Sequence, residues 1–169
     1  MNVLETERLR IRWLSLEDAG FILELLNDAA WLQFIGDFKV RTLEDARAYL
    51  VRSPLAMYAR LGSGLYLTEL KQERVPIGIC GLIKRDFLDD VDIGFGFLAN
   101  FRGQGYAYEA ATAVLQYGKE TFGLKRIAAI TAPDNQASGR LLEKLGLHFE
   151  RVICSPSDGE EVKLFIGDL

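Results

Sequence analysis

A short stretch near the middle of the chain places the strongest constraint on the fold. Residues 91–98 (VDIGFGFL) alternate apolar side chains at period two, which predicts a strand. Residues 106–115 (YAYEAATAVL) are rich in helix formers and lack proline, which predicts a helix. The loop between them carries Gly103 and Gly105, and glycine lets a backbone adopt positive φ and approach a ligand closely. The sequence therefore predicts a glycine-rich turn between a strand and a helix N-terminus.

This arrangement favours the binding of an anion, above all a pyrophosphate. The N–H groups in the first turn of a helix lack intrahelical partners, and the positive end of the helix dipole lies there. Arg102 adds a guanidinium suited to phosphate. A dinucleotide fingerprint is excluded because Tyr108 stands where its third glycine belongs, and the chain has no phosphate-loop Gly-Lys-Ser/Thr sequence. An ordinary helix start that binds nothing is the competing interpretation.

Composition indicates one ordinary globular domain over residues 1–169, expected to be cytoplasmic. The net charge of −4 gives no basic footprint for nucleic acid. No apolar run is long enough to span a membrane, and the first residues do not resemble a signal peptide. Cys80 lies in an apolar run and is expected to be buried, and a single histidine and two distant cysteines argue against a metal site or a disulfide framework.

The remaining patterns predict alternating strands and helices. Ser15 with Asp18, and Thr42 with Asp45, are spaced as capping boxes that begin two helices. The segment 29–40 contains Trp31 and Phe34, which form either the edge of the core or a lid over a substrate pocket, and burial of large apolar residues favours the core. Further strands are expected near residues 9–13, 65–70, 77–83, 125–131, 147–153 and 162–166, and a further helix between Asn135 and Gly146.

Several stretches together resemble the GNAT superfamily of N-acetyltransferases. Residues 102–107 (RGQGYA) match its acetyl-coenzyme A signature, Arg/Gln-x-x-Gly-x-Gly/Ala. Residues 5–12 (ETERLRIR) and 92–95 (DIGF) resemble the ribosomal-protein-acetylating, RimJ/RimL-like branch. Residues 135–146 resemble the second coenzyme motif of that branch, so the likeness covers essentially the whole chain in order. It implies an α/β (α+β) fold, with a mixed, mostly antiparallel sheet flanked by helices on both faces and central strands that splay to admit the coenzyme arm.

The resemblance also implies roles for individual residues. Asn135 would bond the coenzyme arm and Ser138 would protonate the leaving thiolate. The alternative is a purely structural pair, with Asn135 as an N-cap and Ser138 in the first helical turn. Asp92 occupies the position of the general base, with Glu69 as a second candidate. An ordinary Asp has a pKa near ~3.9, so its surroundings would have to raise it, and an Asp facing solvent is the alternative. The cofactor-binding set is Phe97, Leu98, Arg102, Gly103, Gln104, Gly105, Tyr106, Ala107, Asn135 and Ser138.

The function implied is direct transfer of an acetyl group from acetyl-coenzyme A to a primary amine. The acceptor would be a protein N-terminal α-amine or a small amine such as an amino acid or a polyamine. Its pocket is expected from residues 31–38, including Trp31 and Phe34, and from the turn at residues 155–160. A non-catalytic acyl-coenzyme A binding or sensor module is the alternative. The last hairpin has an edge that a second copy could pair with in a homodimer.

Overall fold

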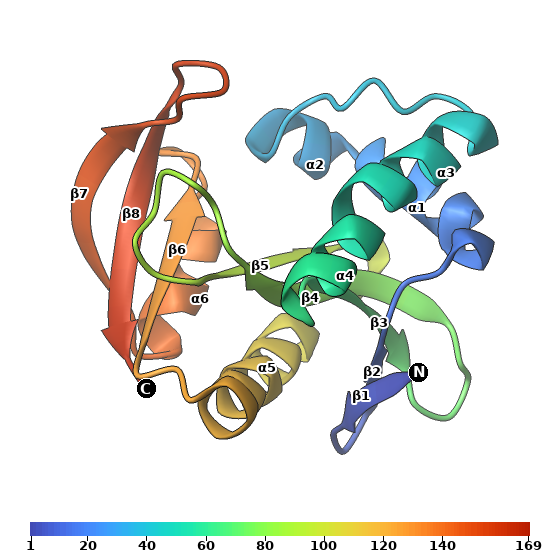
Figure 1. Cartoon of the computed structure of the whole chain (residues 1–169), viewed down its shortest axis with the longest axis horizontal. Coiled ribbons are helices and arrows are strands. Elements are labelled where there is room, and N and C mark those ends of the chain that lie inside the picture. Colours follow the sequence, from blue (N-terminus) through green and yellow to red (C-terminus); the bar gives the residue numbers. More distant parts are fainter.

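In a computed structural model, which describes all of residues 1–169, the chain forms one eight-stranded sheet with helices on both faces (Figure 1). The strand order is β1-β2-β3-β4-β5-β6-β8-β7, and all neighbours are antiparallel except β5 and β6. The strands are β1 (Asn2–Glu5), β2 (Leu9–Arg12), β3 (Leu65–Leu70), β4 (Pro76–Ile83), β5 (Asp92–Phe97), β6 (Arg126–Thr131), β7 (His148–Cys154) and β8 (Glu161–Asp168). The helices are α1 (Ala19–Leu26), α2 (Ala29–Phe34), α3 (Leu43–Leu50), α4 (Ala56–Leu61), α5 (Tyr106–Phe122) and α6 (Gln136–Lys144).

The two faces of the sheet are covered by different helices because successive strand residues point to opposite sides. On β3 and β4, Tyr66 and Cys80 belong to the core cluster that contains Val114 of α5. Leu67 and Ile79, one position away on each strand, belong to the cluster formed by α1, α2 and α3. The predicted mixed, mostly antiparallel sheet with helices on both faces is therefore confirmed, as is the burial of Cys80.

The sheet splits between β5 and β6. These parallel strands pair at one position, Asp92 opposite Ala128, where the Ala128 N–H donates to the Val91 carbonyl at 2.9 Å. On its other edge β5 pairs with β4 along its whole length, from Asp92 to Phe97. Beyond Asp92 the two strands diverge in Figure 1, so the β6-facing edge of β5 lacks a partner strand. This confirms the expected splaying of the central strands.

Local sequence signals fixed several element boundaries. Both capping boxes form, with Thr42 and Asp45 closing the start of α3, and Ser15 and Asp18 closing a 3-10 turn (Leu16–Asp18) that leads into α1. The helix α2 and the strand β1 were not predicted, and α4 was not expected as a helix separate from the one that begins after Thr42. Each has at most six residues, which is too short to show a clear hydrophobic period. A π-helical turn (Val51–Leu55) joins α3 to α4, and a 3-10 turn (Ala99–Phe101) lies between β5 and α5.

Other predicted features can be compared with the structure. No helix is long and apolar enough to cross a membrane. No group of three or more His, Cys, Asp or Glu side chains is placed to hold a metal ion. The strand β7 forms one edge of the sheet, where Phe149 and Val152 are exposed.

Candidate active site

The glycine-rich loop forms the start of α5 as the sequence predicted. Gly103 and Gly105 have φ values of 72° and 83°, a left-handed conformation that side chains with a Cβ adopt only with strain. Gly105 is the N-cap of α5, and its carbonyl accepts the first helical hydrogen bond, from the Glu109 N–H at 3.0 Å. The N–H groups before Glu109 are therefore not used within the helix. They lie at a cavity of about 450 Å³ that is lined by Gly103, Gly105, Tyr106 and Ala107.

Arg102 lines the same cavity, but its guanidinium is bonded within the protein. Its Nε donates to the Phe97 carbonyl at 2.9 Å, and a terminal nitrogen bonds Oδ1 of Asp28. Asp28 is also the N-cap of α2, accepting from the N–H groups of Ala30 and Trp31. Although partial burial opposes ionisation of Asp28, the bond from Arg102 holds its pKa below the ordinary value. Arg102 thus connects the glycine-rich loop to α2.

Two residues of the predicted cofactor set do not line this cavity. The Gln104 side-chain amide donates to the Asn100 carbonyl at 2.8 Å, so it is occupied within the loop. The Leu98 N–H donates to the Ile77 carbonyl of the β4 side at 2.9 Å. Because backbone groups alternate direction along a strand, the Phe97 N–H points toward the split instead. Phe97 lines the cavity and Leu98 packs against the core cluster of α1–α3.

Arg8 and Lys144 are basic residues near the loop whose roles sequence reasoning missed. The Arg8 guanidinium donates to the Gln104 carbonyl at 3.1 Å, bonds Glu109 at 2.7 Å and lies 4.3 Å from the centre of the Tyr106 ring. Lys144 of α6 lines the cavity, with its Nζ 4.3 Å from the centre of the Tyr108 ring. Arg8 lies in the turn between β1 and β2 and Lys144 lies in α6, both far from the loop in sequence, so no local pattern places them beside it.

A second cavity, of about 540 Å³, shares part of its lining with the first one. It is bounded by α2, by the loop after β4, and by the turn between β7 and β8. The residues that line both cavities are Trp31, Phe34, Ile35, Phe95, Asn135 and Ser138. The junction of the two cavities is therefore the place where two bound molecules would touch.

Asn135 and Ser138, which line both cavities, form the N-cap contact that the sequence offered as one interpretation. The Asn135 side-chain oxygen accepts from the Ser138 N–H at 3.2 Å, which makes Asn135 the N-cap of α6. The Asn135 amide nitrogen and the Ser138 hydroxyl make no hydrogen bond within the protein. Both polar groups are therefore available to a ligand, and the capping role does not exclude contact with a coenzyme.

Asp92 lies in the larger cavity with its side chain buried. It is 1% exposed, and Nε of Arg85 lies 3.2 Å from each of its carboxylate oxygens. Burial raises the pKa of Asp92 above its ordinary value, because it disfavours the charged form, and the Arg85 charge offsets only part of this rise. The alternative of an Asp facing solvent is therefore wrong. A buried carboxylate with a raised pKa is suited to accept a proton.

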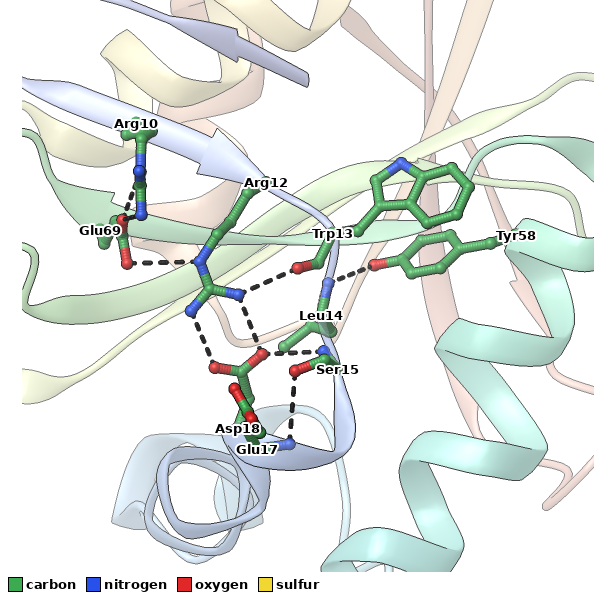
Figure 2. Close-up of polar contacts among 9 residues, drawn as sticks. All are labelled: Arg10, Arg12, Trp13, Leu14, Ser15, Glu17, Asp18, Tyr58 and Glu69. Carbon is green, nitrogen blue, oxygen red and sulfur yellow. Dashed lines mark hydrogen bonds and ion pairs between the residues drawn. The ribbon is translucent and has the colours of Figure 1, made fainter. Parts of the chain in front are cut away.

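Glu69, the second candidate base, lines neither cavity. It is 2% exposed and bonded to Arg10 and Arg12 of the neighbouring strand β2 (Figure 2). Arg12 also binds Asp18 through two hydrogen bonds of 2.9 and 3.0 Å. Glu69 therefore belongs to a buried ion-pair network that joins the sheet to the start of α1. Its charge is used in the fold, and we exclude it as a candidate base.

Trp31 combines a position in the core with a position at the cavities, and its expected contact with a substrate stays a prediction. It is 6% exposed within the core cluster of α1–α3, and it lines both cavities. A Cβ on Gly96 would lie 2.7 Å from the Trp31 ring, so glycine on β5 permits this close packing. The indole N–H of Trp31 is buried and has no hydrogen-bond partner within the protein. Phe34 is half-buried at the same junction.

The family of the chain is now defined by its fold and by comparison with known proteins. A family profile described as "Acetyltransferase (GNAT) domain" matches residues 8–148, so the chain belongs to the GNAT family and is an acetyl-coenzyme A-dependent acyltransferase. The "Uncharacterized N-acetyltransferase YnaD" of Bacillus subtilis is 30% identical over 159 residues, covering 93% of this chain and 90% of that protein. Solved relatives include a GNAT-family acetyltransferase from Bacillus anthracis, at 28% identity and a TM-score of 0.80 over 98% of this chain and 97% of that one.

The fold also resembles that of RimL, an acetyltransferase for the α-amine of ribosomal protein L7/L12 that was solved with coenzyme A. The two chains superpose with a TM-score of 0.84 over 100% of this chain and 98% of RimL, at 17% sequence identity. This agreement over the whole chain confirms the fold expected from the RimJ/RimL-like motifs.

Proposed function

We propose that this chain, acting as one domain over residues 1–169, transfers the acetyl group of acetyl-coenzyme A directly to a primary amine. The observation that supports it most is the meeting of two cavities at the split between β5 and β6. The coenzyme would occupy the 450 Å³ cavity, with its pyrophosphate at the N–H groups of Gly103 to Ala107. Its arm would lie along the unpaired edge of β5, and Asn135 would donate a hydrogen bond to it.

The amine would enter the 540 Å³ cavity and meet the thioester at the junction. Asp92 would take a proton from the ammonium, directly or through a water, which frees the nitrogen lone pair. The nitrogen attacks the carbonyl carbon, and an N–H group of β5 stabilises the oxyanion. When the C–S bond breaks, the sulfur keeps the electron pair and receives a proton from the Ser138 hydroxyl. The oxygen of Ser138 regains a proton from the positively charged nitrogen of the intermediate, which leaves a neutral amide. The products are the N-acetyl amine and free coenzyme A.

Thermal unfolding with acetyl-coenzyme A tests the cofactor assignment. At a hundred times Kd, binding adds about 2.7 kcal/mol to the free energy of unfolding, which raises Tm by roughly 5–10 °C for a chain of this size. NAD is the control ligand and should leave Tm unchanged. In Gly105→Glu the added bulk and negative charge at the loop should abolish the rise. A rise with NAD alone would show that the loop binds another nucleotide.

The enzymatic step is tested with Ser138→Ala. Removal of a general acid typically costs about 100-fold or more in turnover, while the Tm rise with acetyl-coenzyme A should persist. Unchanged turnover would remove Ser138 from the mechanism. A wild-type protein that binds acetyl-coenzyme A but acetylates nothing in a broad amine panel would instead support the non-catalytic binding module. The acceptor class and the homodimer expected from the last hairpin remain predictions.

A further inference from the structure

Among the charged residues that line the larger cavity, one ion pair is placed to bind an acceptor. Lys84 is occupied, because its Nζ donates to the carbonyls of Arg85 and Leu88. Asp158 is exposed on the turn between β7 and β8, where its carboxylate accepts from the Glu160 N–H. The other two charged residues that line the cavity are Asp92 and Arg85, in contact with each other.

Arg85 makes an incomplete contact with Asp92. Its Nε alone bonds the carboxylate, at 3.2 Å to each oxygen, and its terminal amino groups make no hydrogen bond within the protein. The side chain is 35% exposed and lines the cavity. A guanidinium holds up to five N–H donors in a planar fork that suits a carboxylate. The free part of this fork is therefore available to an anionic group of a ligand.

Charge balance narrows the class of acceptor. Asp92 and Arg85 are already neutral as a pair, so a polyamine would bring several positive charges to a cavity with one exposed carboxylate, that of Asp158. A ligand that carries one ammonium and one carboxylate keeps the site neutral, since its ammonium faces Asp92 and its carboxylate faces Arg85. In an α-amino acid the ammonium and the carboxylate are both bonded to the α-carbon, so they lie close enough to face Asp92 and Arg85 together.

Another part of the cavity lining is aromatic. Trp31 and Phe38 meet edge to face, with ring centres 5.8 Å apart, and Phe38 and Tyr49 lie 5.9 Å apart. All three residues line the cavity, together with Met57. Phe38 is 37% exposed although it is a large apolar residue, which leaves apolar surface for a ligand to cover. A volume of about 540 Å³ is typical of a site for a small molecule.

We propose that the acceptor is a free α-amino acid with an aromatic or long aliphatic side chain, whose carboxylate binds Arg85, whose amine faces Asp92 and whose side chain packs on the wall formed by Trp31, Phe38 and Tyr49. This inference rests on the proposed function. It assigns Arg85 as the residue that determines specificity for a free carboxylate.

Three related amines test the assignment on the wild-type protein. L-phenylalanine carries the carboxylate, L-phenylalaninamide replaces it with a neutral amide, and 2-phenylethylamine lacks it. We expect kcat/KM for phenylalanine to exceed that for the amide by at least about 10-fold, the usual value of a hydrogen bond to a charged group. Acetylation of the amide with equal or higher kcat/KM would overturn the inference while leaving the proposed function intact. Failure to acetylate any amine, with coenzyme still bound, would overturn the proposed function and the inference with it.

Variants of Arg85 separate recognition of the carboxylate from a general effect on Asp92. Because a change in the Asp92 pKa affects both substrates, the ratio of kcat/KM for phenylalanine to that for the amide isolates recognition. Arg85→Gln should bring this ratio close to one, and Arg85→Lys, which keeps the charge, should retain part of it. Arg126→Gln is the matched control, since Arg126 pairs with Asp90 at 3.1 Å on the surface and lines neither cavity. An unchanged ratio in Arg85→Gln would overturn the assignment, provided that the Tm rise with acetyl-coenzyme A shows the variant to be folded.

Discussion

Asp92 and Ser138 lie in different surroundings, and these surroundings suit their different roles. Asp92 is buried against Arg85, and burial raises its pKa. Ser138 is half-buried at the junction of the cavities, with its N–H fixed by Asn135 and its hydroxyl free. In the proposed mechanism the carboxylate would therefore take a proton from the amine, and the hydroxyl would give one to the coenzyme sulfur.

We expect Asp92→Asn to lower kcat/KM by roughly 100-fold or more, because the amide cannot accept the proton. The wild-type profile should lose activity as pH falls, because the carboxylate must be ionised to act. Since burial raises the Asp92 pKa, this loss should be centred above the ordinary value of about 3.9. A pH profile of kcat/KM for both proteins checks this, with acetyl-coenzyme A binding as the control. An unchanged acidic limb in Asp92→Asn would assign the base to another group.

At the scale of elements, the start of α5 is held by the turn between β1 and β2. Glu109, in the first turn of α5, accepts from the Thr6 hydroxyl at 2.6 Å, from the Arg8 N–H at 2.9 Å and from Arg8 Nε at 2.7 Å. The Arg8 guanidinium also donates a hydrogen bond to the Gln104 carbonyl in the glycine-rich loop. The ETERLRIR segment, far away in sequence, therefore fixes the backbone that is proposed to bind pyrophosphate.

Glu109→Gln should lower the free energy of unfolding at pH 7 by about 1 kcal/mol, the usual value of a partly exposed charged hydrogen bond. Although partial burial opposes ionisation of Glu109, its bonds to Thr6 and Arg8 lower its pKa in the folded state. Its contribution is thus complete above the unfolded value of about 4.3 and is lost as pH falls through the lower folded value. The Tm difference between wild type and variant should therefore shrink from pH 7 to pH 3.5. A difference that is constant with pH would show that the charge of Glu109 does not stabilise the fold.

At the scale of the whole molecule, the sheet separates two layers of helices, and its strands part at one place, between β5 and β6. The helices α5 and α6 pack on one face and α1, α2 and α3 on the other, and the split between β5 and β6 joins the two cavities. Arg102 crosses between these parts, from the coenzyme loop to the N-cap of α2. The coenzyme and the acceptor would thus be bound by separate sets of side chains that share a small junction.

Variants on the two sides should therefore act independently. Lys144→Ala should raise KM for acetyl-coenzyme A, because it removes a positive charge from the coenzyme cavity. Phe38→Ala should raise KM for the amine, because it removes part of the aromatic wall. The effects of the double variant on kcat/KM, as free energies, should add to within about 0.5 kcal/mol. A larger coupling, measured by steady-state kinetics with each substrate varied, would show that the two cavities do not act separately.

The sequence by itself determined the elements whose signals are local. Strand alternation, capping boxes and the glycine loop depend on neighbouring residues, so they predicted the central strands, the starts of α1 and α3, and the loop before α5. The motif order identified the family and, with it, the split sheet. Local patterns did not predict α2 or a separate α4, because each helix is too short to show a hydrophobic period. Short helices of this kind depend on tertiary packing for their stability.

Tertiary structure decided what each polar side chain faces. Arg102 and Gln104 belong to the coenzyme motif, yet one is bonded to Asp28 and the other to Asn100. Glu69 on β3 and Asp92 on β5 are both buried carboxylates of the same sheet, but two arginines of β2 bond Glu69 while Asp92 lines a cavity. Such differences arise from partners distant in the chain, and burial among them sets the charge and pKa of a group. A local pattern can therefore name a candidate residue, and only its packed surroundings determine whether it is free to act.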